Sequence, residues 1–206
     1  MSSSFALLTI ENRDAALFEQ RQRLYCFEAY FSSCFLSTVP FCATFATFYF
    51  TVSYWMIAMN PSFSLFLGTL GVFAVAALIG FAQGFLIGTF SPTSDLVVLI
   101  TNIIAQADFL VITNSFMPAQ WLQYISITKC TLSSTAYIQF DHDDYVLAVD
   151  AQYTFPLGST ITGDDFLRLI IQPTGSFAFN FGMLFVLLAF YLTLAYICGK
   201  YIHSSG

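Results

Sequence analysis

One apolar stretch of the sequence carries polar and acidic side chains at helical spacing. Asn102, Gln106, Phe109 and Thr113 follow one another at intervals of four, three and four residues, so they share one face of a helix. Lipid does not tolerate a polar face, so this stripe is expected to face a protein partner or a water-filled cavity. Asp108 projects from the same helix roughly 120° away from the stripe.

Asp108 is the acid whose position could support chemistry. It lies about 18 Å along the apolar segment, near the middle of a bilayer. A carboxylate at that depth is protonated, paired with a neighbouring helix or exposed to water. A structural hydrogen bond and a role in a translocation path both remain open, and outside the tails only Lys129 and Arg168 could pair with it. An intramembrane enzyme would depend on Asp108 alone.

Small residues recur at intervals of four in the preceding apolar stretch, at Ala76, Gly80, Gly84 and Gly88. Residues four apart lie on one ridge of a helix, and the missing side chains let another backbone approach closely. The ridge therefore predicts a helix–helix contact within the chain or between chains. A surface that slides during a transport cycle is the alternative.

Soluble catalytic and metal signatures are absent from the sequence. It contains no phosphate-binding Gly-x-x-x-x-Gly-Lys-Ser/Thr loop, no His-Glu-x-x-His, no Cys-x-x-Cys and no Gly-x-Ser-x-Gly. The run from Asp141 to Asp144 favours a solvated acidic turn, because consecutive ligands rarely converge on one ion. We therefore expect no catalytic residue, no metal site and no ATPase activity in this chain.

The composition indicates whether the protein is surrounded by water or by lipid. The 206 residues include 18 charged side chains, 9% of the chain, whereas 57% are hydrophobic and 25 are Phe. A water-soluble surface needs about a quarter to a third of its positions charged. A net charge of −6 without a basic cluster also argues against a nucleic-acid partner. The sequence therefore predicts an integral membrane protein with lipid as its surroundings.

Charges and turn residues divide the chain into spans. From Ala29 to Ser94 there is no Asp, Glu, Lys, Arg or His over 66 residues, and Asn60-Pro61 interrupts this run near its middle. Because one crossing needs about 20 residues, we expect transmembrane helices at about 31–59 and 63–89. Two further apolar runs predict helices at about 96–116 and 177–199.

The remaining segments complete an all-α membrane fold. Residues 1–30 read as an amphipathic connecting helix and 200–206 as a short tail. Residues 117–176 divide into a re-entrant or interfacial helix at 121–140 and a polar outer loop with a little strand at 145–154. Arg13, Arg21, Arg23 and Lys200 place both termini on the cytoplasmic side by the positive-inside rule.

Several short motifs, taken in order, resemble the membrane domain of the G family of ABC transporters, the White-type half-transporters. They extend over nearly the whole chain and comprise Phe18-Glu19-Gln20-Arg21 followed by Tyr25, Tyr30-Phe31 and Pro40; Tyr54 with Met59-Asn60-Pro61; and Trp121-Leu122-Gln123-Tyr124-Ile125-Ser126 with Lys129 and Phe140. The nucleotide-binding domain and the first two spans of that family are absent from this sequence, and 5–10 resemble a remnant of the second span.

The resemblance implies roles for the segments singled out above. The four spans would correspond to the third to sixth of the family, and the helix at 96–116 would line a substrate cavity at a dimer interface with Asn102, Gln106, Phe109 and Thr113. Glu19, Arg21 and Tyr25 would belong to the coupling helix. ATP and Mg²⁺ would bind a partner nucleotide-binding domain, on a separate chain or in a missing N-terminal part.

Two functions follow as hypotheses. The first is the membrane part of an ATP-driven exporter of lipids or other hydrophobic compounds, acting as a homo- or heterodimer. The second is a non-transporting membrane scaffold, or a degenerate transporter fragment, that uses the glycine ridge to bind other helices.

Overall fold

A computed structural model of the protein describes residues 6–7, 9–11, 18–19, 22, 26–56, 62–112, 122–140 and 176–205. Most of these residues lie in helices, and no strand occurs among them. Four of the helices are long and apolar enough to cross a membrane, which confirms the predicted all-α membrane fold. The named helices are α2 (Phe27–Met56), α3 (Phe63–Phe90), α4 (Ser94–Ile112), α5 (Leu122–Ile125), α6 (Ile127–Phe140) and α8 (Phe177–Ser205).

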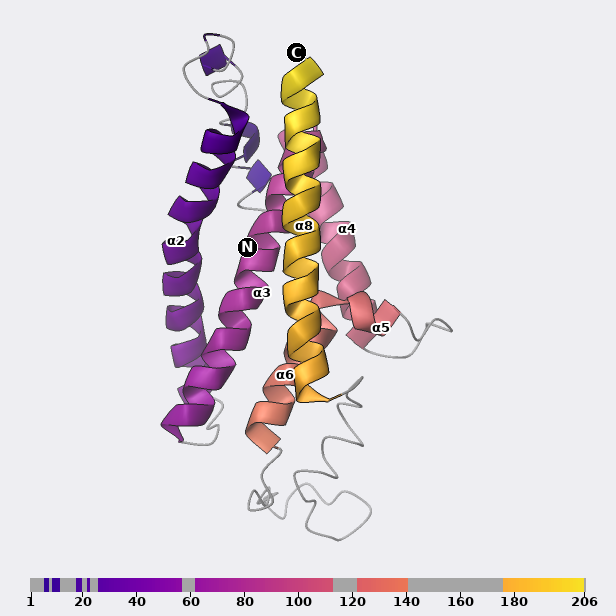
Figure 1. The fold of residues 1–206 in the computed structure, drawn as a ribbon. Coiled ribbons are helices and arrows are strands. Elements are labelled where there is room, and N and C mark those ends of the chain that lie inside the picture. Colours follow the sequence, from indigo (N-terminus) through magenta and orange to yellow (C-terminus); the bar gives the residue numbers. More distant parts are fainter. Residues whose placement is uncertain are drawn as a thin grey trace, which may run out of the picture.

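The four long helices run alternately in opposite directions, so the start of α2 and the end of α8 lie at one end of the bundle (Figure 1). Extended backbone at Ser62 and Ser91 bounds α3 on both sides. α2 begins four residues before the predicted position and α8 continues to Ser205. Glu28 lies in the first turn of α2, where a carboxylate complements the helix dipole.

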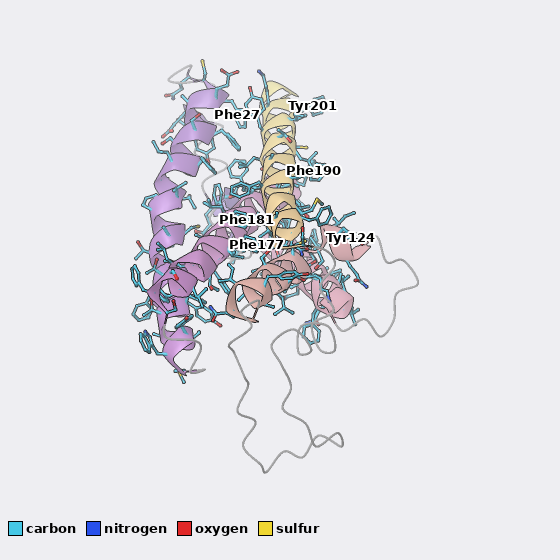
Figure 2. The ribbon with its side chains drawn as sticks, turned by 60° about the horizontal axis from the view of Figure 1, so that its bottom comes forward. Phe27, Tyr124, Phe177, Phe181, Phe190 and Tyr201 are labelled. Carbon is cyan, nitrogen blue, oxygen red and sulfur yellow. The ribbon has the colours of Figure 1, made fainter. Side chains whose placement is uncertain are left out.

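α3 occupies the centre and packs against α8, α2 and α6. One core cluster joins α3, α6 and α8 and consists of Val72, Ile79, Cys130, Leu184 and Leu187. Aromatic side chains extend along α8 from Phe177 to Tyr201, and Tyr124 of α5 lies near its beginning (Figure 2). The Tyr124 and Phe179 rings meet edge-on, with their centroids 5.7 Å apart.

α2 shows how a spanning helix tolerates hydroxyl groups on an exposed face. The hydroxyls of Thr44, Thr47 and Thr51 each donate to the carbonyl four residues earlier, at 2.6–2.8 Å. These bonds satisfy the hydroxyls within the helix itself. The same face carries large apolar side chains such as Phe48 and Trp55, so α2 can present it to lipid.

The predicted re-entrant segment at 121–140 is two helices in the structure, because α5 ends at Ile125 and α6 begins at Ile127. α6 packs between α3, α4 and α8, and its buried residues are mostly polar. The amide of Gln139 donates to the hydroxyl of Thr69 on α3 at 2.9 Å. A sequence pattern can indicate that a helix is amphipathic, but it cannot show that protein covers most of the helix surface, as it does in α6.

The N-terminal residues that the structure describes pack at the turn between α3 and α4. Ala6 is fully buried with Ile87 and Val97, and Leu7 and Ile10 border this cluster. In the segment predicted as a span remnant, residues 5–10, the residues that the structure describes therefore cover the end of α3. The predicted strand at 145–154 and the acidic run at 141–144 lie outside the described residues.

Candidate functional site

The polar stripe of α4 points away from the other described helices. Asn102 and Gln106 are exposed, and Phe109, which follows Gln106 on the stripe, is 58% exposed. Thr113, the fourth predicted member, lies outside the described residues. No described part of the chain therefore covers this stripe, and its contact with substrate stays a prediction.

The opposite face of α4 lies against the bundle. Val97 and Thr101 are buried there, and the Thr101 hydroxyl donates to the Val97 carbonyl at 2.7 Å. Asp108 follows Thr101 after two helical turns, so it lies on this inner face. The acid and the polar stripe therefore project from different sides of one helix.

Two adjoining cavities surround Asp108 where α3, α4, α5, α6 and α8 meet. Their volumes are about 210 and 260 Å³. Both are lined by Gln83, Ile104, Asp108 and Ile127, so they share one wall. The lining of the first is about half polar and adds Thr101 and Thr128, whereas the lining of the second is mostly apolar and adds Ile103, Val111, Ile125 and Tyr191.

Ser126, at the break between α5 and α6, connects Asp108 to the start of α6. Its hydroxyl hydrogen-bonds the Asp108 side chain. Its Oγ also accepts a hydrogen bond from the Lys129 amide at 3.3 Å, which is the geometry of a helix N-cap. The Asp108 carboxylate thus lies near the positive end of the α6 dipole, which favours an anion there.

Lys129 does not line either cavity, although it lies only three residues beyond Ser126. Its side chain is 1% exposed, and burial lowers the pKa of its ammonium group. Neither cavity lining includes a Lys or Arg in the part of the chain that the structure describes. Arg168, the other predicted basic partner for Asp108, lies outside that part.

The glycine ridge of α3 has two different environments. Ala76 and Gly80 line the polar cavity, and a Cβ added at Gly80 would meet nothing within 4 Å. A Cβ added at Gly88 would lie 2.7 Å from the Ala6 carbonyl oxygen, so a second backbone approaches closely there. Gly84 is buried between these two positions. The ridge therefore borders a cavity at one end and a backbone contact at the other.

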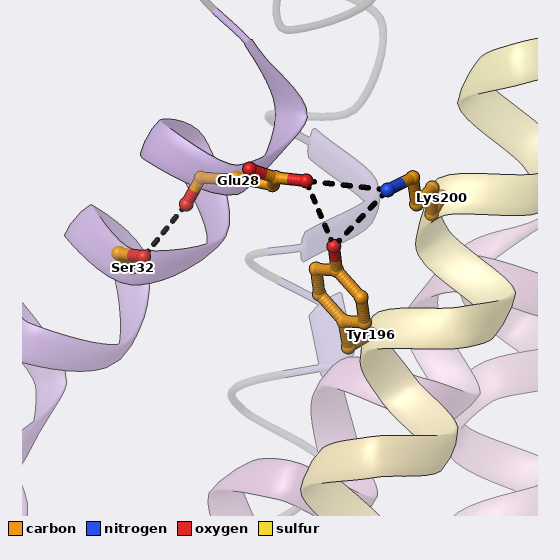
Figure 3. A network of polar contacts seen from close by, with 4 residues as sticks. All are labelled: Glu28, Ser32, Tyr196 and Lys200. Carbon is orange, nitrogen blue, oxygen red and sulfur yellow. Dashed lines mark hydrogen bonds and ion pairs between the residues drawn. The ribbon is translucent and has the colours of Figure 1, made fainter.

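A second polar group joins α2 and α8 at the end of the bundle where α2 begins and α8 ends (Figure 3). The Tyr196 hydroxyl and the Lys200 ammonium both donate to Oε1 of Glu28, at 3.0 and 3.2 Å.

Of the predicted coupling residues, Glu19 is described and exposed, whereas Arg21 and Tyr25 lie outside the described residues.

Sequence reasoning missed Ser126, Thr101 and Tyr191 as neighbours of Asp108. Ser126 carried a usable signal, because Ser is among the residues preferred at a helix N-cap. The other two depend on how α4 and α8 are oriented, which spacing along the chain does not fix. Within the ranges described, no group of three His, Cys, Asp or Glu side chains converges as a metal site.

Comparison with known proteins places this helical arrangement in a family. The family model described as ABC-2 type transporter matches residues 1–140, which include three of the spanning helices together with α5 and α6. A comparison with curated proteins finds no match. Because the family model covers more than half of the chain, the protein belongs to the ABC-2 type transporter family and represents its membrane domain.

Proposed function

We propose that this chain is the membrane-spanning part of an ATP-driven exporter of the G, or White, type that moves lipids or other hydrophobic compounds. Membership in the ABC-2 family supports the transporter class. The order of the motifs from Phe18 to Phe140 favours the G type. In this proposal both termini face the cytoplasm.

The observation that carries the proposal is the exposed polar stripe of α4. Asn102 and Gln106 lie on the outside of a helix that is long and apolar enough to span a membrane. Amide side chains on spanning helices bind other helices or border water, because lipid offers them no hydrogen-bond partner. A second transporter chain, with a substrate cavity between the two copies, would satisfy both needs.

ATP chemistry would take place on a partner. The sequence has no phosphate-binding loop, so ATP and Mg²⁺ would bind a nucleotide-binding domain on another chain or in another part of the protein. Membrane domains of the ABC-2 family pair with such a partner. ATP binding would then shift the spanning helices between inward-open and outward-open states, and this chain would supply the walls of the path.

The test is substrate-stimulated ATP hydrolysis by the nucleotide-binding partner, measured in a complex isolated through a tag on this chain. Asn102→Leu and Gln106→Leu are expected to change the stimulation by hydrophobic substrates while the complex still assembles. Leu96→Ile is the matched control, because Leu96 is exposed on the same helix but lies away from the stripe. Unchanged stimulation in both amide variants would contradict the proposal.

A non-transporting scaffold that uses the glycine ridge to bind other helices is the second candidate. Gly84 is buried on α3, so Gly84→Leu would disturb the packing of that helix. A scaffold predicts that this variant loses its partner chains, whereas both amide variants behave like the unaltered protein.

A further inference from the structure

The cavity on the inner side of α4 is separate from the exposed stripe and contains the acid. Asp108 lines both adjoining cavities and lies in a spanning helix. An ionisable residue in such a helix is costly, so its surroundings indicate what it binds. These surroundings are residues of α3, α4, α5, α6 and α8 together with Ser126.

The smaller cavity has hydrogen-bond acceptors near the negative charge of Asp108. Gln83, Thr101 and Thr128 line the cavity beside Asp108. Ser126 takes up one acceptor position of the carboxylate, which has about four in total. The remaining positions, together with amide and hydroxyl oxygens, are suited to a group that carries several N–H donors and a positive charge.

The lining of the larger cavity is mostly apolar and reaches the surface of the bundle. Ile103, Ile104, Val111, Ile125 and Tyr191 line the larger cavity, and Ile103 is 60% exposed at the surface of the bundle. A volume of about 260 Å³ is below that of a typical drug-sized pocket. It suits a headgroup and the first few carbons of a chain whose remainder extends past Ile103.

We propose that the Asp108 cavity binds the protonated amine of a hydrophobic amine, with its alkyl chain along the isoleucine wall. The carboxylate of Asp108 pairs with the ammonium group, and Gln83 and Thr101 accept further N–H bonds. Neutral compounds of the same length lack the charge that compensates a carboxylate in a spanning helix. The role of the amine as cargo rests on the proposed export function, whereas its binding does not.

The experiment measures binding of radiolabelled octylamine at pH 7.4 to the full chain in lipid nanodiscs, with empty nanodiscs as background. An alkylamine is protonated at this pH, because its pKa is about 10, like that of a Lys side chain. We expect saturable binding of octylamine and none of octanol. Asp108→Asn is expected to weaken octylamine binding by about tenfold or more, as for a lost charge-assisted hydrogen bond.

Asp95→Asn is the matched control, because Asp95 is an exposed acid in the first turn of the same helix. It should bind octylamine as the unaltered chain does. Equal binding of octylamine and octanol by the unaltered chain would overturn the proposal without any variant, even if Asp108→Asn failed to fold. Unweakened binding in a folded Asp108→Asn variant would overturn it as well.

The export function and the amine site at Asp108 can be disproved independently of each other. Loss of amine selectivity with intact ATP-driven turnover of other substrates would remove the inference and leave the export function. Amine binding that depends on Asp108, without any stimulation of a partner ATPase, would keep the site and contradict export.

Discussion

The Lys200 ammonium lies 3.2 Å from the Glu28 carboxylate, although 172 residues separate them along the chain. This contact joins the beginning of α2 to the end of α8, two helices that touch little elsewhere. Phe27 reinforces the junction, because its ring packs directly on Gly199 and lies 5.9 Å from the Tyr196 ring between centroids. The end of the bundle is therefore closed by an exposed ion pair placed beside an aromatic contact.

The aromatic contact is expected to contribute more stability than the ion pair. The Lys200 and Glu28 side chains are 57% and 65% exposed, so water and salt screen their attraction. Phe27→Ala should lower stability by about 1–2 kcal/mol, because the ring is only partly buried. Both variants are compared by thermal unfolding in detergent, where Glu28→Gln should lower the midpoint less than Phe27→Ala does. A larger loss for Glu28→Gln than for Phe27→Ala would refute this ranking.

The glycine ridge predicts opposite effects for the same substitution at two positions. Gly88→Ala would bring a Cβ to within 2.7–2.8 Å of Ala6 and Thr9, so the N-terminal segment must shift. We expect a loss of about 1–3 kcal/mol, as for other overpacked sites. Gly80→Ala faces open space and should be neutral or slightly stabilising. Thermal unfolding of the two variants compares them, and equal midpoints would contradict the close approach at Gly88.

Cys130 provides a test of the burial of α6. Burial and the nearby charge of Asp108 raise the pKa of the Cys130 thiol to about 11, so about one thiol in a thousand is ionised at pH 8. Cys26 is exposed. In single-cysteine variants, N-ethylmaleimide should modify Cys26 at least about a hundredfold faster than Cys130 at pH 8. Comparable rates would show that α6 is not enclosed by α3 and α8.

Ser126 should contribute to stability in two ways. Its hydroxyl caps α6 and hydrogen-bonds Asp108, so Ser126→Ala removes both interactions. The expected loss of unfolding free energy is about 1–3 kcal/mol. Ser126→Thr keeps a hydroxyl and should recover most of it in the same thermal unfolding measurement. If the Thr and Ala variants were equally unstable, the hydroxyl would not be the group that matters.

The sequence was sufficient to predict the spans and the residues that interrupt them. The stretch without charges from Ala29 to Ser94 is too long for one crossing, and Asn60-Pro61 predicts its division. The structure has α2 and α3 on either side of that position. Hydropathy succeeds here because a helix in lipid must satisfy its own backbone, so each long apolar run has one available structure.

The surroundings of Asp108 could not be predicted in the same way. Helical spacing separates Asp108 from the stripe of Asn102 and Gln106, and the structure places the stripe outside and the acid inside. That Gln83 and Tyr191 face Asp108 depends on the rotation of α3 and α8 about their axes. Their sequences are apolar nearly all round, so spacing along them leaves that rotation undetermined.

The orientation of the α4 stripe can be measured directly by the accessibility of single cysteines in native membranes. Asn102→Cys and Gln106→Cys would be made in the full chain after replacement of its five native cysteines, with Leu96→Cys for comparison. If the stripe borders a water-filled path between transporter chains, a charged methanethiosulfonate reagent should modify positions 102 and 106 much faster than position 96. Equally slow modification at all three positions would mean that no water-filled path borders the stripe, and the export account would be wrong.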